Sequence, residues 1–196
     1  MKNILITWDS KWIWKYLKDN LEKKYNIFWY SRTNNFDLTK FETFEKIKND
    51  IWINKIDILI LNAWIWEFWK FESLNLKDLE NIINLNLIAN IRILKFLEEN
   101  IKKDTKIIFI WSIISKKFMK DAAVYQASKF GIRWLAWWLK NEWKKVFLIN
   151  PKIVDTDFHK WKVELNNKLP ETKKEDIFNV INRIIIGEEN RFEIDL

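Results

Sequence analysis

Short apolar runs alternate along the chain with longer stretches in which apolar residues recur every three or four positions. The short runs predict β-strands, because a strand buried on both faces is apolar throughout, and the longer stretches have the period of amphipathic helices. The predicted strands are residues 2–7, 26–31, 56–62, 106–112, 145–150 and 191–195. The predicted helices are residues 12–24, 39–52, 76–103, 124–143 and 175–186, of which the third is long enough to contain a break.

Strands that alternate with helices are typical of βαβ units, so we expect an α/β fold with a three-layer, doubly wound parallel sheet. No linker, repeat or low-complexity stretch interrupts the pattern, which predicts a single domain over residues 1–196. In such sheets, ligands bind beyond the carboxyl ends of the strands. We therefore expect functional residues directly after Thr7, Ser31, Asn62, Ser112 and Asn150.

Composition excludes several classes of protein. The chain is 48 % hydrophobic and 31 % charged, which argues against disorder, and it has no cysteine for a disulfide, a thiolate metal site or a nucleophile. Its one histidine, His159, argues against a histidine-built zinc site and a Ser-His-Asp triad, so we expect no metal. No segment approaches the roughly 18 consecutive apolar residues of a membrane span. The first residues have the pattern of a strand and not of a signal peptide, so we expect a cytoplasmic protein with no membrane partner.

The net charge of +7 raises the alternative of a basic nucleic-acid binder, which would bind DNA or RNA in a salt-sensitive way. However, 29 of the 34 basic residues are lysines, and they are spread along the chain among asparagines and isoleucines. A nucleic-acid surface usually clusters its charge and favours arginine forks. We therefore expect no nucleic-acid partner.

Tryptophan and glycine occur in unusual numbers. The chain has 14 tryptophans and two glycines, whereas average usage would give roughly 14 glycines in a chain of this size. The first predicted strand is followed by Thr7-Trp8-Asp9-Ser10-Lys11-Trp12-Ile13-Trp14. Literal indoles would fill a phosphate-binding loop, where glycines permit the tight turn and the close approach of the backbone. With glycine in place of tryptophan, the segment has the pattern T-G-x-x-x-G-x-G at the start of a helix.

This glycine pattern resembles that of the short-chain dehydrogenases/reductases, and the resemblance continues over essentially the whole chain. Asn62-Ala63-Trp64 is similar to the N-A-G motif of that family, and Tyr125-Gln126-Ala127-Ser128-Lys129 matches its Y-x-A-S-K motif. Ser112 lies 13 residues before Tyr125, the usual separation, and Asn86 matches the fourth catalytic position. Residues 150–156 resemble the N-P-G-x-V-x-T segment, with Lys152 at the glycine position as a departure. The resemblance implies a Rossmann-like, NAD(P)-binding domain.

Four residues would carry the chemistry that the resemblance implies, the interconversion of a carbonyl and an alcohol on a small molecule. Tyr125 and Lys129 are four residues apart and share a helix face. A neighbouring ammonium lowers the pKa of a tyrosine, so we expect Tyr125 to act as general acid and base. Lys129 would also hold the nicotinamide ribose, Ser112 would donate a hydrogen bond to the substrate oxygen, and Asn86 would position a water that relays protons.

The cofactor predicted from the second strand is NADP(H). No acid follows that strand to bind a ribose 2′-hydroxyl, whereas Arg32 follows it and Lys11 lies in the first loop, where relatives that prefer NADP carry a base. Two solvated cations remain the alternative interpretation. No apolar run marks a further strand before Asp37-Leu38, a pair similar to the adenine-contacting residues of the family. The predicted cofactor-binding residues are Thr7, Trp8, Ser10, Lys11, Trp12, Ile13, Trp14, Arg32, Asp37, Leu38, Asn62, Ala63, Trp64, Tyr125, Lys129, Pro151, Ile153 and Thr156.

Two hypotheses account for the tryptophans. Those at positions 8, 12, 14, 64, 111 and 134 stand where the family prefers glycine or a small residue, so the gene would use UGA codons that are read as glycine. If the tryptophans are literal, the chain would instead be a non-catalytic dinucleotide-binding or structural relative whose phosphate site is filled by indoles. The resemblance also implies a homodimer or homotetramer. Trp137, Trp138 and Trp143 would suggest an aromatic interface only if they are literal.

Overall fold

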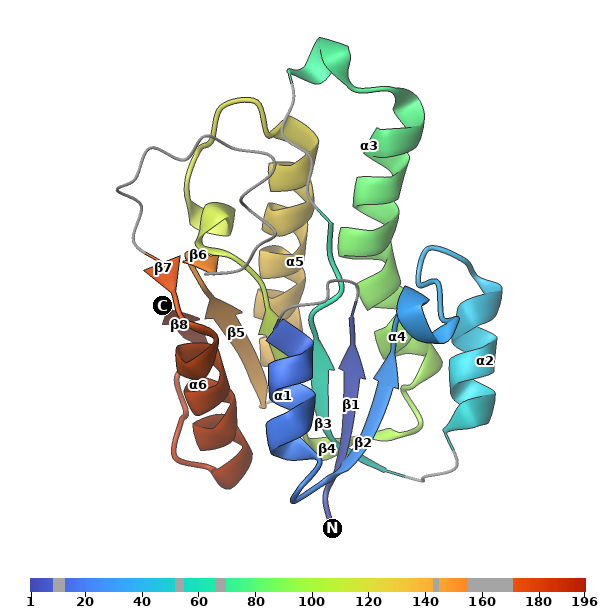
Figure 1. Ribbon diagram of the computed structural model, residues 1–196, viewed down its shortest axis with the longest axis vertical. Helices are drawn as coiled ribbons and strands as arrows, with labels where there is room; N and C mark the ends of the chain where they lie inside the picture. Colours follow the sequence, from blue (N-terminus) through green and yellow to red (C-terminus); the bar gives the residue numbers. More distant parts are fainter. Residues whose placement is uncertain (9–12, 52–54, 66–69, 143–144, 155–170) are drawn as a thin grey trace.

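The computed structural model describes residues 1–8, 13–51, 55–65, 70–142, 145–154 and 171–196. Its centre is a parallel sheet of six strands in the order β2-β1-β3-β4-β5-β8 (Figure 1). These strands are β1 (Asn3–Thr7), β2 (Asn26–Tyr30), β3 (Ile56–Leu61), β4 (Ile101–Ile110), β5 (Val146–Asn150) and β8 (Glu193–Asp195). A separate pair is formed by β6 (Ile153–Val154) and β7 (Glu171–Thr172). The predicted α/β, Rossmann-like parallel sheet is therefore confirmed.

Helices cover both faces of the sheet (Figure 1). The α-helices are α1 (Ile13–Leu21), α2 (Glu42–Asp50), α3 (Leu76–Ile83), α4 (Ala89–Phe96), α5 (Ala123–Glu142) and α6 (Lys174–Ile186). The shorter turns are η1 (Arg32–Asn34), η2 (Phe71–Ser73), the π-helical η3 (Asn84–Ile88) and η4 (Ile113–Lys116). One layer is formed by α1 and α6, and the other by α2, α4 and α5.

Neighbouring residues of each central strand point into different layers. Leu5 and Leu59 pack with α2, α4 and α5, whereas Ile4 and Ile58 pack with α1 and α6. Alternate side chains of a strand point to opposite faces, and both faces of this sheet are buried. This is why the strand sequences are apolar throughout and carry little of the alternation that marks a half-exposed strand.

The prediction of one helix over residues 76–103 is wrong at its C-terminal end. The helix contains the π turn η3 and ends at Phe96, and the chain turns where the amide of Asn100 donates to the carbonyl of Leu97 at 2.9 Å. Residues 101–105 belong to β4, in which Ile101 pairs with Ile56. Tertiary pairing with β3 therefore overrides the helical periodicity of this segment.

No strand forms in residues 31–41, all of which the structure describes, so β2 is the edge of the sheet. The side chain of Asp37 accepts hydrogen bonds from the amide and the hydroxyl of Thr39, at 3.0 and 2.7 Å. This turn delays α2 to Glu42, three residues after the predicted start.

The two glycines of the chain lie where glycine has a physical advantage. Gly187 ends α6 with a φ of +92°, in the left-handed region that strains other residues. A Cβ on Gly131 would lie 3.1 Å from Cδ2 of Leu87, so this glycine permits close packing of α5 against η3.

Candidate active site

The carboxyl ends of β1, β3, β4 and β5 meet at one edge of the sheet, because these strands are parallel and lie next to one another in this order. Thr7 pairs with Leu61, and the next amide along, that of Asn62, donates to the hydroxyl of Thr7 at 3.4 Å. Trp111 follows β4, and its amide donates to the carbonyl of Ile149 at 2.8 Å. The strand ends at which the sequence predicts function therefore lie side by side.

Tyr125 and Lys129 come from α5, which packs over this edge, and both side chains are buried. The Lys129 amine lies 5.1 Å from the centre of the Tyr125 ring. Tyr125 packs in a small apolar cluster with Ala122, and Trp64, Ile114 and Met119 border this cluster. The pairing of the two residues expected from their spacing is therefore present, in surroundings that are largely apolar.

Two indole rings enclose the Lys129 amine. Its Nζ lies 3.7 Å from the centre of the Trp111 ring and 4.2 Å from that of Trp64. Within the described residues, this Nζ is fully buried and makes no hydrogen bond. A cation gains from the faces of aromatic rings, but a buried ammonium without hydrogen bonds is costly. The two tryptophans thus take the place of hydrogen-bond partners around the Lys129 amine.

The pKa values of the pair are shifted in directions that the sequence does not predict. Burial lowers the pKa of the Lys129 amine well below its ordinary value, and burial raises the pKa of the Tyr125 hydroxyl. Our expectation that Lys129 lowers the pKa of Tyr125 is wrong for this arrangement. An amine that desolvation drives toward its neutral form supplies little positive charge to a neighbouring phenol.

Ser112 lies directly after Trp111 and caps η4. Its hydroxyl oxygen accepts a hydrogen bond from the amide of Ile114 at 3.3 Å, and the amide of Ile113 donates to the carbonyl of Pro151 at 3.0 Å. The second bond places the turn that carries Ser112 against the segment expected to contact the cofactor. Because the hydroxyl acts here as an acceptor, its own hydrogen is available to a further partner.

Asn86 lies in η3 and is fully buried. Its side-chain oxygen accepts from the amide of Ile65 at 2.8 Å, and its Nδ2 donates to the carbonyl of Ile65 at 2.8 Å and to the hydroxyl of Ser128 at 3.0 Å. The side-chain amide therefore ties the loop after β3, which carries Trp64, to the helix that carries Tyr125. The role of Asn86 toward a proton-relaying water stays a prediction.

The structure describes only some of the other predicted cofactor-binding residues. Trp8 and Ile13 are buried in the layer of α1 and α6, Thr7 and Ala63 are buried at the ends of β1 and β3, and Pro151 is buried after β5. Ser10, Lys11, Trp12 and Thr156 lie outside the described residues, as does His159, and the side chains of Trp14 and Ile153 are not described either.

The end of β2 presents Arg32 at the surface. Ser31 is buried and caps η1, and the exposed Arg32 is the first residue of that turn. Leu38, by contrast, is only 2 % exposed and belongs to the core beside α2 and α4. Arg32 is thus exposed at the end of β2, whereas Leu38 acts as a core residue.

Buried polar groups at this edge test whether a dinucleotide cofactor fits. Within the described residues, both side-chain polar atoms of Asn62 and the Oδ1 of Asn150 are buried without a hydrogen-bond partner, as is the Lys129 amine. Buried polar groups are nearly always satisfied, so these atoms mark a place where a polar ligand would be favourable. The unsatisfied asparagine atoms fit such a ligand, whereas the Lys129 amine is covered by the indoles of Trp64 and Trp111.

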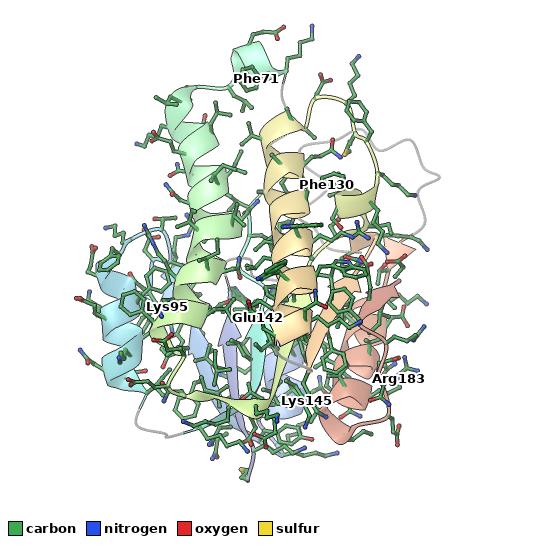
Figure 2. The ribbon with its side chains drawn as sticks, turned by 180° about the vertical axis from the view of Figure 1, so that it is seen from behind. Phe71, Lys95, Phe130, Glu142, Lys145 and Arg183 are labelled. Carbon is green, nitrogen blue, oxygen red and sulfur yellow. The ribbon has the colours of Figure 1, made fainter. Side chains whose placement is uncertain are left out.

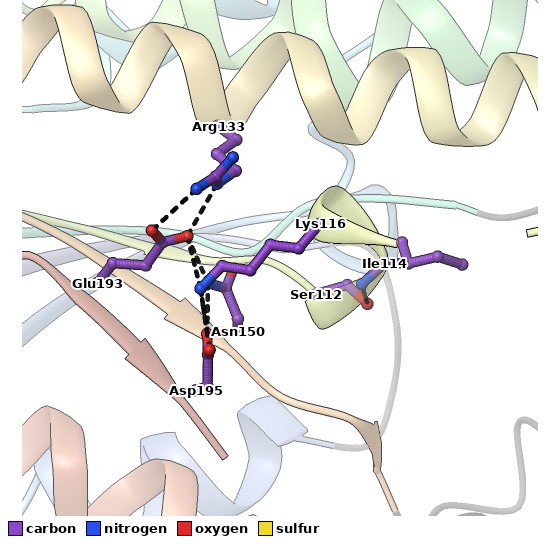
Figure 3. A network of polar contacts seen from close by, with 7 residues as sticks. All are labelled: Ser112, Ile114, Lys116, Arg133, Asn150, Glu193 and Asp195. Carbon is purple, nitrogen blue, oxygen red and sulfur yellow. Dashed lines mark hydrogen bonds and ion pairs between the residues drawn. The ribbon is translucent and has the colours of Figure 1, made fainter. Parts of the chain in front are cut away.

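Two structural features near the site were not predicted from the sequence. Gln126 accepts a hydrogen bond from the amide of Met119 at 2.9 Å and donates to the carbonyl of Lys117, which ties the loop before α5 to the helix. Glu193 forms a network with Arg133, Lys116 and Asn150 (Figure 3). The only sequence signal for Gln126 is its place beside Tyr125, and Glu193 carries no local signal at all.

Within the described residues, no group of three or more metal-binding side chains is present. Over the same residues, no helix combines the length and the apolar character that crossing a membrane requires.

A family model described as short chain dehydrogenase matches residues 19–166 of the chain. The chain therefore belongs to the short-chain dehydrogenase family. No curated protein matches the sequence.

Solved structures with low sequence identity share the fold. A short chain dehydrogenase family protein from Francisella tularensis is 20 % identical, with a TM-score of 0.84 and coverage of 100 % of this chain and 97 % of that one. A protein from Listeria innocua is 14 % identical, with a TM-score of 0.83 and full coverage of both chains. An alcohol dehydrogenase from Thermococcus sibiricus, complexed with 5-hydroxy-NADP, is 20 % identical, with a TM-score of 0.76 and coverage of 100 % and 96 %.

Proposed function

We propose that this chain is an NADP(H)-dependent oxidoreductase that interconverts a carbonyl and an alcohol on a small molecule, with Tyr125 as general acid and base. The observation that carries the proposal is the position of Tyr125 and Lys129 on one helix, beside the strand ends that carry Asn62, Ser112 and Pro151. Membership of the short-chain dehydrogenase family supports the same class of reaction.

Each side chain has a role that its chemistry supports. Tyr125 would donate its proton to the substrate oxygen during reduction and recover it during oxidation. Ser112 would donate its hydroxyl hydrogen to the same oxygen, because its lone pair already accepts from Ile114. Lys129 would hold the ribose of the cofactor, and the hydride is the chemistry that a bound nicotinamide supplies.

The preference for NADP(H) over NAD(H) rests on Arg32. Arg32 is an exposed residue that follows β2, where an NAD site places an acid, and guanidinium forks pair well with phosphates. That the similar Thermococcus sibiricus alcohol dehydrogenase was solved with 5-hydroxy-NADP also supports this choice.

We further propose that the tryptophans at family glycine positions are glycines in the organism, encoded by UGA. The enclosure of Lys129 by Trp64 and Trp111 supports this idea, because glycine at both positions would free the amine that the reaction requires. Reading the genomic codons tests it. We expect UGA at positions 8, 12, 14, 64, 111 and 134, and UGG codons at positions 8, 12, 14 and 64 would refute the proposal.

The second candidate is a non-catalytic dinucleotide-binding or structural relative. The observation that favours it is again the Lys129 amine, which is buried between two indoles if those residues are literal. Titration with NADPH together with a turnover assay, on one chain as printed and one with glycine at the 14 tryptophan positions, separates the candidates. Turnover of a panel of carbonyl compounds by either chain favours the enzyme. Absence of turnover in both favours the non-catalytic relative.

A homodimer or homotetramer is the oligomeric state that we propose. Phe130, Trp134 and Trp138 follow one another at steps of four along α5 and are 47 %, 73 % and 59 % exposed, and Phe130 is labelled in Figure 2. This stripe would favour association with a partner only in a chain whose residues 134 and 138 are literal tryptophans. With glycine at these positions, the proposal rests on the family resemblance alone. Size-exclusion chromatography with light scattering tests the proposal, and a monomer at micromolar concentration in both chains would contradict it.

A further inference from the structure

A carboxylate from the last strand lies where three parts of the candidate active site meet (Figure 3). Glu193 accepts two hydrogen bonds from the guanidinium of Arg133, at 2.9 Å to Nε and 3.2 Å to Nη2. Its Oε1 lies 3.1 Å from the Lys116 amine and accepts from Nδ2 of Asn150 at 2.9 Å. One side chain thus contacts a helix, a turn and the end of a neighbouring strand.

Each of the three residues that Glu193 contacts lies on the same element as a residue of the site or directly beside one. Arg133 lies one turn of α5 beyond Lys129 and two turns beyond Tyr125, on the same side of the helix. Lys116 is the last residue of η4, the turn that Ser112 caps. Asn150 directly precedes Pro151, whose carbonyl accepts from Ile113. Glu193 therefore bridges the elements that carry Ser112 and Tyr125.

Strand pairing and hydrogen bonds join residues 193–196 to β5, to the segment after it and to η4. Glu193 pairs with Leu148 in the sheet, the amide of Leu196 donates to the carbonyl of Asn150 at 3.1 Å, and the amide of Lys152 donates to the carbonyl of Leu196 at 3.3 Å. Asp195 adds two hydrogen bonds from the Lys116 amine, at 2.7 and 2.9 Å. Although burial raises the pKa of Glu193, hydrogen bonds from Arg133, Lys116 and Asn150 hold it below its usual value. The group is thus ionised at neutral pH.

We propose that Glu193 is a positioning residue of the oxidoreductase site, which fixes Ser112 relative to Tyr125 by holding Lys116 and Arg133 at the same time. This inference rests on the function proposed above. Two donors directed at one substrate oxygen must keep their separation, because small misplacements of catalytic groups cause large losses of rate. Neither Glu193 nor its partners need to touch the substrate.

The test compares Glu193→Gln with Glu193→Asp and with a matched control. The control is Glu189→Gln, which removes a carboxylate held by two arginines, Arg183 and Arg191, in the loop between α6 and β8. In the chain that shows turnover, we expect Glu193→Gln to lower kcat by about tenfold or more, with the Kd for NADPH within about twofold of the parent. Glu193→Asp should recover part of kcat, and Glu189→Gln should leave kcat unchanged.

Unchanged kcat in Glu193→Gln, or an equal loss in Glu189→Gln, overturns the inference. Hydrogen exchange provides a second measurement that needs no turnover, so failure of the proposed function is distinguished from failure of this one. We expect the amides of Ile113 and Ser115 to lose protection by about tenfold in Glu193→Gln and to keep it in Glu189→Gln. If neither chain reduces any carbonyl, unchanged protection of these two amides in Glu193→Gln overturns the inference on its own.

Discussion

The Nζ of Lys129 lies 3.7 Å from the centre of the Trp111 ring, while the Nε1 of the same indole donates to the backbone carbonyl of Lys129 at 2.9 Å. The tryptophan therefore contacts both ends of the lysine, fixing the backbone of α5 and covering the amine. Glycine at position 111 would provide neither contact. Together with Trp64, whose ring centre lies 4.2 Å from the same amine, Trp111 keeps Lys129 within the core.

Replacing Trp64 and Trp111 together with glycine should expose Lys129. We expect the affinity for NADPH to rise by at least about tenfold, because the amine gains hydrogen-bond partners and returns toward its charged form. The free energy of unfolding should fall by several kcal/mol, because two large side chains leave the core. Fluorescence titration and urea unfolding measure the two effects. Trp134→Gly, at a position 73 % exposed, is the control, and an equal gain in affinity there would contradict the explanation.

Tyr125→Phe should abolish reduction of carbonyl compounds while leaving NADPH bound. The substitution removes only the hydroxyl, and loss of a general acid costs about 10²–10⁴-fold in rate. Turnover is followed by the absorbance of NADPH, and binding by titration. Tyr16→Phe changes a ring that packs on Phe178 in the opposite layer and should leave kcat intact. Full turnover in Tyr125→Phe would exclude the assigned role.

Arg32→Ala should weaken NADPH binding by about tenfold or more and leave NADH binding unchanged, because only NADPH carries the 2′-phosphate that a guanidinium can hold. The ratio of the two dissociation constants is the measurement. Arg92→Ala is a suitable control, since this guanidinium lies over the rings of Phe41 and Phe44 in the layer of α2 and α4. Tighter binding of NADH than of NADPH by the parent chain would refute the choice of cofactor.

Glu189 should stabilise the fold at neutral pH and lose this effect in acid. Hydrogen bonds from Arg191 lower its pKa from 4.5 to about 2. A depressed carboxyl pKa contributes stability that is fully present above the unfolded value, near 4.5, and is lost as the pH falls toward about 2. The gap in unfolding free energy between the parent and Glu189→Gln should therefore be constant above pH 5 and narrow below about pH 4.5. Urea unfolding at several pH values measures it, and a gap independent of pH would contradict the assignment.

Gly187→Ala should destabilise the chain by about 1–2 kcal/mol, because an alanine is strained in the left-handed region that this residue occupies at the end of α6. Its Cβ would meet no atom within 4 Å, so the cost comes from the backbone alone. Gly187→Asn, a residue that tolerates this region better, should recover part of the loss. Equal stability of all three chains would show that the backbone relaxes there.

Sequence reasoning succeeds where the determinant is local. The apolar run at residues 56–61 predicts a buried strand because both of its faces are covered, and the spacing of Tyr125 and Lys129 places both on one helix face. It fails where the determinant is tertiary. The sequence around Ile101 has the apolar spacing of a helix, yet Ile101 pairs with Ile56 in the sheet. The burial that lowers the pKa of Lys129 involves two rings, which follow two different strands. The contacts of Glu193 likewise join residues 43 to 77 positions apart.

The π turn at Asn84–Ile88 holds one residue more than an α-helical turn of the same rise, with the amide of Ala89 donating to the carbonyl of Asn84. Deleting one residue here would give a more regular helix. However, the deletion would rotate α3 by about 100° relative to α4 about the helix axis. Asn86 could then face Ile65 only if the helix before it turned away from α5. A protein engineer who removed this irregularity to improve the helix would separate the loop after β3 from the helix of Tyr125.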